Sequence, residues 1–287
     1  MKTAEVKFTS RYLSAQDGLR LHYREYGDVI WSSTPILCLP GLTRNAADFH
    51  AFASRHASER CVVVLDYRGR GEAAFDPNPR NYLPEIYAND ILHLAAAANV
   101  SSAIVVGTSL GGLLAMSLAA QRPGILAGVV VNDIGPEIDP SGLDNIRKYL
   151  AMDLHPSSWD EAADMVKQIS LSAAPDFTEN QWLDLACRSF RQDDTGAVRL
   201  DFDPALATTF LDSEPAPELW PLFGGLKHIP TFAIRGALSD VLSQQTFEKM
   251  AEAKPDLIQV TVPNRGHVPW LYEPEAKNAV DEFIAGL

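Results

Sequence analysis

The chain has 287 residues, and its composition of 46% hydrophobic and 21% charged residues is ordinary for a globular protein with a substantial core. The formal net charge of −13 argues against a nucleic-acid-binding protein, because phosphate recognition needs a basic surface. Residues 136–220 hold 17 Asp or Glu against 6 Lys or Arg, and this local change in composition indicates a separate surface unit inserted into a scaffold.

The sequence has no segment that resembles a targeting or membrane-spanning sequence. Residues 1–18 lack the apolar stretch of a signal peptide, and no run of about 18 apolar residues occurs that could cross a bilayer. Cys38, Cys61 and Cys187 do not have a metal-binding spacing, so we expect buried, reduced thiols. We therefore predict a cytoplasmic protein without a membrane partner, either a monomer or a homodimer.

In chain order, a predicted antiparallel hairpin comes first, with strands at 6–13 and 19–26 around Gln16-Asp17-Gly18. Short β-branched apolar runs, typical of strands buried on both faces, then occur at 35–39, 61–65, 103–106, 126–131, 230–234 and 257–262. Helical spacing separates many of them, at 85–99, 110–121, 243–253 and 275–284. This order predicts an α/β fold with a mostly parallel, eight-stranded sheet flanked by helices.

The alternation of strands and helices stops after Val131. The sequence then becomes helix-like and punctuated by prolines, and the next strand begins only at about Ile229. We predict that residues 136–220 form a helical cap inserted after the sixth strand, and that residues 1–135 and 221–287 form the catalytic core.

Reactive residues are sought directly after the strands, because ligands bind beyond the carboxyl ends of the strands in an open parallel sheet. Gly107-Thr108-Ser109-Leu110-Gly111 follows one strand and precedes a helix, which is the context of a nucleophile elbow. The flanking glycines permit a strained turn, and the helix N-terminus favours developing negative charge. Ser109 is therefore the predicted nucleophile, although a glycine-rich turn can also be purely structural.

The predicted general base is His267, which follows the last long strand within Asn264-Arg265-Gly266-His267. A late histidine matches the chain order of nucleophile, acid and base in this architecture. For the acid we favour Asp240, which lies in the loop after the strand at 230–234, where it would orient the imidazole. Asp133 is the alternative, because it directly follows the strand at 126–131; otherwise we expect it to fix the start of the cap.

The turn Leu39-Pro40-Gly41-Leu42-Thr43 follows the third strand. Its glycine permits a close backbone approach, so the amides of Leu42 and Leu110 are predicted to hold the oxyanion of a tetrahedral intermediate. A purely structural turn is the alternative.

Taken together, these motifs resemble the α/β-hydrolase superfamily over essentially the whole chain. The matching landmarks occur in the order of that family, namely Leu39-Pro-Gly-Leu42, Asp66-Tyr-Arg-Gly-Arg-Gly71, Gly107-Thr-Ser-Leu-Gly111, Gly236-Ala-Leu-Ser-Asp240 and Gly266-His267. Within the superfamily the chain is similar to cap-bearing enol-lactonases, small-ester hydrolases and carbon–carbon hydrolases, and the resemblance implies a Ser109, Asp240 and His267 triad. One departure is Pro40, where many relatives have a histidine.

These predictions describe a serine hydrolase that cleaves a small ester or lactone through an acyl-enzyme and needs no metal or cofactor. A carbon–carbon bond hydrolase of a ring-cleavage product and a ligand receptor on the same fold are the alternatives. The acidic cap argues against a strongly anionic substrate, unless local arginines override it. The aromatic residues that we consider as pocket walls are Trp159, Phe177, Trp182, Phe190, Phe210, Trp220 and Trp270, with core packing as the other reading for each.

Overall fold

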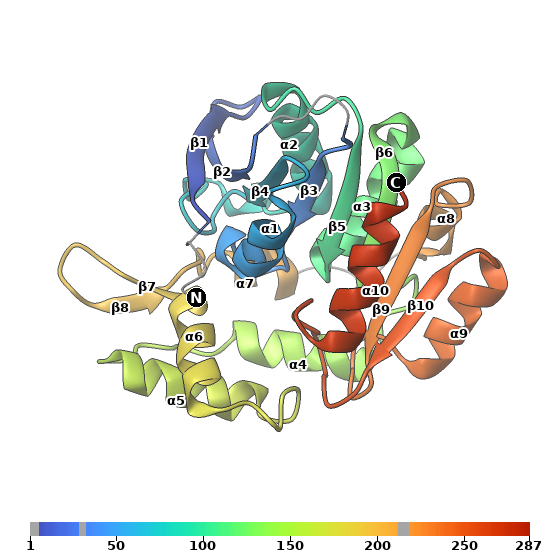
Figure 1. Ribbon diagram of the computed structural model, residues 1–287. Helices are drawn as coiled ribbons and strands as arrows, with labels where there is room; N and C mark the ends of the chain where they lie inside the picture. The colour runs from blue at the N-terminus through green and yellow to red at the C-terminus, as the bar shows by residue number, and fades with distance from the viewer. Residues whose placement is uncertain (1–5, 29–32, 212–217) are drawn as a thin grey trace.

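The computed structural model describes residues 6–28, 33–211 and 218–287, and an eight-stranded sheet lies at the centre of the fold (Figure 1). The strand order is β1-β2-β4-β3-β5-β6-β9-β10, antiparallel between β1, β2 and β4 and parallel elsewhere. The strands are β1 (Phe8–Ser14), β2 (Arg20–Tyr26), β3 (Ile36–Leu39), β4 (Val62–Asp66), β5 (Ala103–Thr108), β6 (Leu126–Asn132), β9 (Thr231–Gly236) and β10 (Ile258–Val262). The predicted fold, including the opening hairpin, is confirmed.

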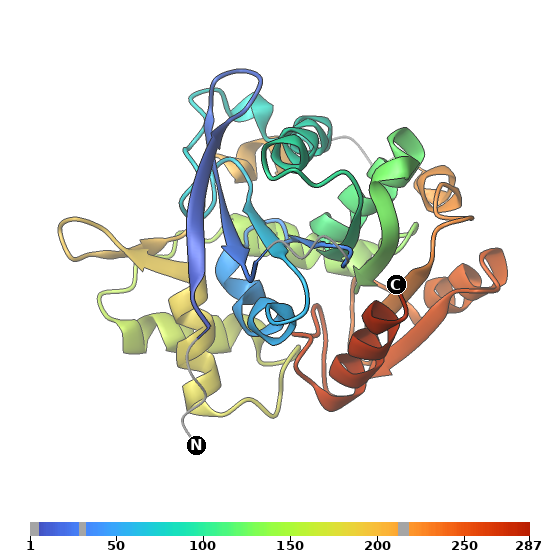
Figure 2. The ribbon, with the colours of Figure 1, turned by 45° about the horizontal axis from the view of Figure 1, so that its top comes forward.

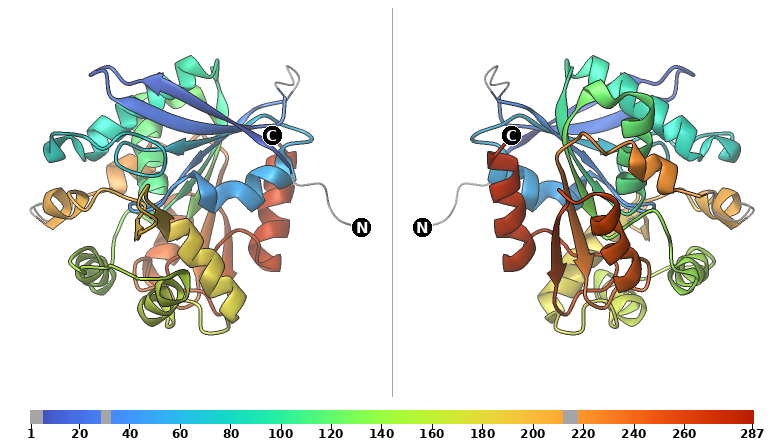
Figure 3. Two further views of the ribbon diagram at one scale, coloured as in Figure 1. Left: turned by 90° about the vertical axis from the view of Figure 1, so that its left-hand side faces the viewer. Right: turned by 90° about the vertical axis from the view of Figure 1, so that its right-hand side faces the viewer.

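Helices cover both faces of this sheet, which is why its central strands are apolar throughout rather than alternating. On β3, Leu37 and Leu39 point to one core, and Ile36 and Cys38 point to the other. The first core packs against α2 (Pro84–Ala97), α3 (Leu110–Gln121), α8 (Trp220–Gly224) and α9 (Gln244–Ala253). The second packs against α1 (His50–His56) and α10 (Pro274–Ala285), which lie on the opposite side of the sheet in Figure 3.

The chain between β6 and β9 is called the insert here. Its described residues, 133–211 and 218–230, are mostly helical and contribute no strand to the main sheet. It contains α4 (Pro140–Leu150), α5 (Trp159–Ser170), α6 (Glu179–Ser189), a hairpin of β7 (Phe190–Gln192) and β8 (Val198–Leu200), α7 (Leu206–Leu211) and α8. The helices α4, α5 and α6 gather at the lower side of the molecule in Figure 1, and Figure 2 shows α5 and α6 at the lower left in the turned view. Residues 212–217, part of the predicted cap, lie outside the described residues.

Polar caps start the three long helices of the insert. Asp139 accepts a hydrogen bond from the Ser141 amide at the start of α4, and Ser158 does the same for Glu161 at the start of α5. Thr178 and Gln181 form a reciprocal capping box at the start of α6. The helices α5 and α6 bury a small apolar cluster of their own, so the insert does not depend on the main core alone.

The predictions about the cysteines and about membrane association have different outcomes. Cys38 and Cys61 are buried free thiols as predicted, but Cys187 is exposed on α6, so the prediction of a buried thiol is wrong there. Among the described residues, none of the helices combines the length and the apolar character that a bilayer crossing requires. The cytoplasmic location and the monomeric or homodimeric state stay predictions.

Asp201 joins the insert to the sheet core, because its carboxylate accepts a hydrogen bond of 2.6 Å from Asn45 Nδ2. Burial, together with the charge of Asp66, raises the pKa of Asp201 to about 6. The folded protein therefore binds a proton there more tightly than the unfolded chain does, and this group lowers stability as pH rises from about 4 through 6.

We predict that Asp201→Asn stabilises the protein by about 1–2 kcal/mol at pH 8, because the uncharged amide avoids the cost of burying a carboxylate. The gain should be much smaller at pH 4 and should vanish near pH 3, where the wild-type carboxyl is mostly protonated in both states. Urea unfolding at several pH values measures this difference. Asp194→Asn, at an exposed position, is the control, and a gain that is equal at pH 4 and pH 8 would contradict the prediction.

Candidate active site

The turn between β5 and α3 carries Ser109 in a backbone conformation that side chains rarely adopt, with φ 52° and ψ −115°. The turn is tight on both sides. A methyl group on Gly107 would overlap the carbonyl of Gly111, and one on Gly111 would overlap the carbonyl of Leu39. The two glycines are therefore needed for close packing, and Ser109 stands at the N-terminus of α3, as predicted for a nucleophile elbow.

His267 connects this serine to a buried carboxylate. Its Nε2 atom lies 2.8 Å from Ser109 Oγ, and its Nδ1 atom lies 2.8 Å from Asp133 Oδ2. A carboxylate only accepts hydrogen bonds, so Nδ1 carries the hydrogen and Nε2 is left free to accept the serine proton. The loops after β5, β6 and β10 thus bring together three side chains in the arrangement of a serine hydrolase triad.

Asp133, and not Asp240, occupies the place of the acid, so the preferred prediction is wrong and its alternative fits the geometry. Asp133 is fully buried at the end of β6, where its carboxylate also accepts hydrogen bonds from the Gly236 amide at 2.8 Å and the Ser239 hydroxyl at 2.7 Å. The end of β9 and the loop after it therefore supply donors to the carboxylate rather than the carboxylate itself. Asp240 points elsewhere and accepts a hydrogen bond of 2.7 Å from Asn145 in α4.

A second chain of the same residue types exists in the molecule. His22 Nδ1 lies 2.6 Å from Asp66 Oδ2, and His22 Nε2 lies 3.2 Å from Ser10 Oγ. Ser10, however, is an exposed residue in the middle of the edge strand β1, and Asp66 also binds the backbone amides of Ala46 and Glu72. This set braces β2 and β4 against the following loops, and it lacks the strained turn and helix N-terminus that distinguish Ser109.

The predicted oxyanion loop lies beside the serine. A Cβ atom placed on Gly41 would stand 3.8 Å from Ser109 Cβ, and Leu42 lines the same pocket as Ser109 and His267. Leu110 is the first residue of α3 and directly follows the serine. Both backbone positions thus adjoin Ser109, and the use of their amides for an oxyanion stays a prediction.

Arg70, which the sequence indicated only as part of a landmark motif, holds the predicted oxyanion loop in place through its backbone. Its fully buried guanidinium donates hydrogen bonds to the Leu42 carbonyl at 2.8 Å, the Arg68 carbonyl at 2.7 Å and the Tyr87 hydroxyl at 2.9 Å. The cation also lies 4.8 Å from the centre of the Tyr87 ring and 5.7 Å from that of Tyr82. Carbonyls and aromatic faces thus take the place of the water that a buried cation loses.

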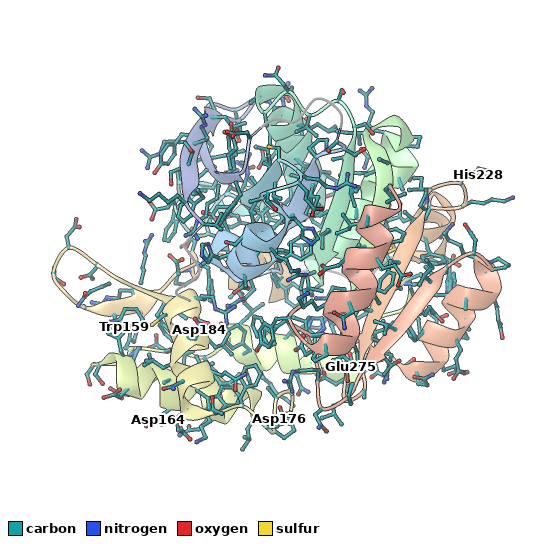
Figure 4. The ribbon with its side chains drawn as sticks, viewed as in Figure 1. Trp159, Asp164, Asp176, Asp184, His228 and Glu275 are labelled. Carbon is teal, nitrogen blue, oxygen red and sulfur yellow. The ribbon has the colours of Figure 1, made fainter. Side chains whose placement is uncertain are left out.

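Ser109 and His267 open on a cavity of about 500 Å³ between the insert and the carboxyl ends of the strands. The predicted pocket wall Trp270 lines this cavity, but Trp159, Trp182 and Phe210 do not appear among its lining residues in the described part of the chain. Trp182 is buried in the cluster of the insert, and Trp159 packs against that cluster at the start of α5, where Figure 4 labels it. Phe210 packs against the main core.

The remaining aromatic candidates also belong to packing rather than to the pocket. Phe177 and Phe190 are buried in the cluster of the insert, and Trp220 donates a hydrogen bond from its indole to Glu137 at 2.8 Å. His228, which lies between α8 and β9, is on the side of the molecule away from α5 and α6 in Figure 4. Aromatic residue type alone therefore does not identify the pocket wall.

The insert holds the loops that carry the site. Asn145 binds Asp240, and the Gly266 amide donates a hydrogen bond of 2.7 Å to the Ala173 carbonyl. Arg265 is buried two residues before the histidine, where it pairs with Asp176 of the insert and with Glu273 at 2.8 Å. The position of His267 thus depends on contacts from both parts of the chain.

Comparisons with known proteins agree with this geometry. A family model described as the alpha/beta hydrolase family matches residues 36–280, so the chain belongs to that family. It is 30% identical to a 3-hydroxybutyrate-oligomer hydrolase of Cupriavidus necator, over 93% of each chain, and 26% identical to a 2-(acetamidomethylene)succinate hydrolase of Mesorhizobium japonicum, over 93% of this chain and 92% of the relative. A crystal structure of an alpha/beta hydrolase from Novosphingobium aromaticivorans is 39% identical and has a TM-score of 0.93, covering 98% of this chain and 99% of that one.

We predict that Asp133→Asn lowers kcat on the order of 10³- to 10⁴-fold, because the amide no longer stabilises the protonated imidazole. Asp240→Asn is the matched variant and should change kcat less than about 10-fold, since Asp240 does not contact His267. Steady-state kinetics with a p-nitrophenyl ester, alongside thermal unfolding of both variants, measures the difference. Equal losses in the two variants would contradict the assignment of Asp133.

We predict that Arg70→Met lowers kcat by about 10- to 100-fold with little change in KM, because the Leu42 amide is no longer held against the transition state. Affinity for a trifluoromethyl ketone, which mimics the tetrahedral intermediate, should fall in parallel. Tyr87→Phe keeps the bond from Arg70 to Leu42 and should have a smaller effect. Destabilisation without any loss of inhibitor affinity would show that Arg70 serves only the fold.

Proposed function

We propose that the protein is a serine hydrolase that cleaves a small carboxylic ester or lactone through an acyl-enzyme. The observation that carries this proposal is the continuous hydrogen-bonded chain from Ser109 through His267 to the buried Asp133, open to a cavity at the serine end. The relative from Cupriavidus necator is a 3-hydroxybutyrate-oligomer hydrolase, which is consistent with ester cleavage.

In the proposed first half-reaction, Ser109 Oγ attacks the substrate carbonyl while His267 Nε2 takes the hydroxyl proton. Asp133 keeps the imidazole in the required tautomer and stabilises its positive charge. The amides of Leu42 and Leu110 hold the oxyanion, and His267 then returns the proton to the departing alcohol oxygen.

In the second half-reaction, a water molecule takes the place of the alcohol. His267 removes its proton as it attacks the acyl carbonyl, and the tetrahedral intermediate collapses to release the acid and restore the Ser109 hydroxyl. In a lactone, the alcohol and the acid belong to one molecule, so a single hydroxy acid leaves. All of these steps use side chains and backbone of the chain and need no metal or cofactor.

Residues 136–220 are proposed to act as a cap that selects the substrate. Support comes from α4 and α5, which supply one side of the cavity, while Ser109, the oxyanion loop and the His267 loop supply the other. A cavity of this size suits a ligand of drug-like dimensions or smaller. The alternative reaction, hydrolysis of a carbon–carbon bond in a ring-cleavage product, would use the same triad. Activity assays should therefore include a coloured dienone substrate beside esters and lactones.

We predict that Ser109→Ala reduces turnover of short p-nitrophenyl esters on the order of 10⁵- to 10⁶-fold, because the nucleophile is lost. Ser10→Ala is the matched control, since Ser10 also lies next to a histidine that contacts an aspartate, and it should retain wild-type kcat/KM. Activity that survives in Ser109→Ala, or that disappears in a folded Ser10→Ala, would overturn the proposal.

A further inference from the structure

The lining of the cavity is electrically different from the chain as a whole. The protein has a formal charge of −13, yet in the described part of the chain the charged residues that line the cavity, besides His267, are two basic and two acidic ones. They are Arg44, Asp48, Lys148 and Asp240. The acidic surface of the insert therefore does not extend into the pocket, and the local charges decide which substrates are accepted.

Three of these four residues are already engaged within the protein. Arg44 donates two hydrogen bonds of 2.6 Å to Asp48 and a third, of 2.5 Å, to Ser189 Oγ. Asp240 accepts its hydrogen bond from Asn145. Among the described residues, Lys148 is the lining charge for which no hydrogen bond or ion pair is found. Its three donor positions are thus available to a ligand.

The helix α4 lines the pocket along its length, with Asp240 near the start of the helix and Lys148 near its end. Gly142, near the start of α4, packs against the backbone of Asp240, and Tyr149, near the end, lines the pocket together with Thr43 of the oxyanion loop. Lys148 comes six positions after Gly142, a rise of about 9 Å at 1.5 Å per residue. A negatively charged group is repelled at the Asp240 end and attracted at the Lys148 end.

We propose that Lys148 binds a free carboxylate of the substrate, so that the natural substrates are esters whose acid or alcohol part carries a second, ionised carboxyl group. This inference rests on the proposed ester hydrolysis and names the class of substrate for it. An oligoester of a hydroxy acid has such a free carboxylate at one end, as does a monoester of a dicarboxylic acid. The general expectation that the acidic insert disfavours anionic substrates is replaced by this local preference.

Arg147 provides a matched comparison on the same turn of α4. A cation in the last turn of a helix stabilises the helix dipole even when it binds no ligand. Arg147 and Lys148 both lie in the last turn of α4, so this explanation applies equally to both. Arg147, however, is absent from the lining residues and pairs with Asp144 at 3.1 Å. The two residues thus share the charge and the helix terminus, and they differ in access to the pocket.

The test compares two p-nitrophenyl esters of nearly equal size, the glutarate monoester with a free carboxylate and its methyl-capped neutral counterpart. Lys148→Gln should raise KM for the anionic ester about 3- to 10-fold with kcat unchanged, and should change KM for the neutral ester less than 2-fold, because Lys148 is exposed and its attraction is partly screened. Arg147→Gln should change neither. In the wild type, 0.5 M salt should raise KM for the anionic ester only.

Equal effects of Lys148→Gln on both esters, or equal effects of Lys148→Gln and Arg147→Gln on the anionic ester, would overturn the carboxylate site. A direct binding measurement separates this inference from the proposed function. Monomethyl glutarate should bind Ser109→Ala, and adding Lys148→Gln should weaken that binding by a similar factor. Binding that is unchanged by the second substitution refutes the site even where turnover is robust, whereas weakened binding supports it even where no ester is turned over.

Discussion

The buried carboxylate of Asp133 is the interaction on which the rest of the site depends. A charge that is fully removed from water needs several hydrogen-bond donors, and this one receives them from the Gly236 amide, the Ser239 hydroxyl and His267. Two of the donors come from the last residue of β9 and from the loop that follows it, and β9 lies next to β6 in the sheet. The order of strands in the sheet is therefore what makes an ionised aspartate tolerable beneath the imidazole, and the imidazole in turn is fixed for the serine.

The insert belongs to the construction of the site as much as the sheet does. Arg44 binds Ser189 at the end of α6, and Asn45 binds Asp201 beyond β8, so the loop that contains Leu42 is held by the insert on one side. On the other side, the Gly266 amide next to His267 is held by the loop after α5. A rearrangement of the insert would therefore displace both the base and the oxyanion loop, and not only the wall of the pocket.

Local sequence rules were sufficient wherever the chain neighbours of a residue decide its role. The strands, Ser109 between a strand and a helix, and His267 after the last strand follow from such rules, and the structure agrees with them. The acid does not, because Asp133 and Asp240 both follow strands of the sheet, and only the folded loop after β9 places Ser239 against Asp133 while Asp240 is bound to Asn145. The contact of Arg70 with Leu42 joins residues far apart in the chain, and the strands of the β7–β8 hairpin are too short to give a periodic pattern.

The set of Ser10, His22 and Asp66 has a wider consequence. A template that recognises hydrolases by the identities and spacing of three side chains would return two answers for this one molecule, and one of them would be a brace in a β-sheet. The two serines differ in their main chain, because Ser10 lies in an extended β-strand and Ser109 lies in a tight turn with a positive φ. Backbone torsion angles are thus a better guide to nucleophilic function here than the hydrogen-bond partners of the hydroxyl group.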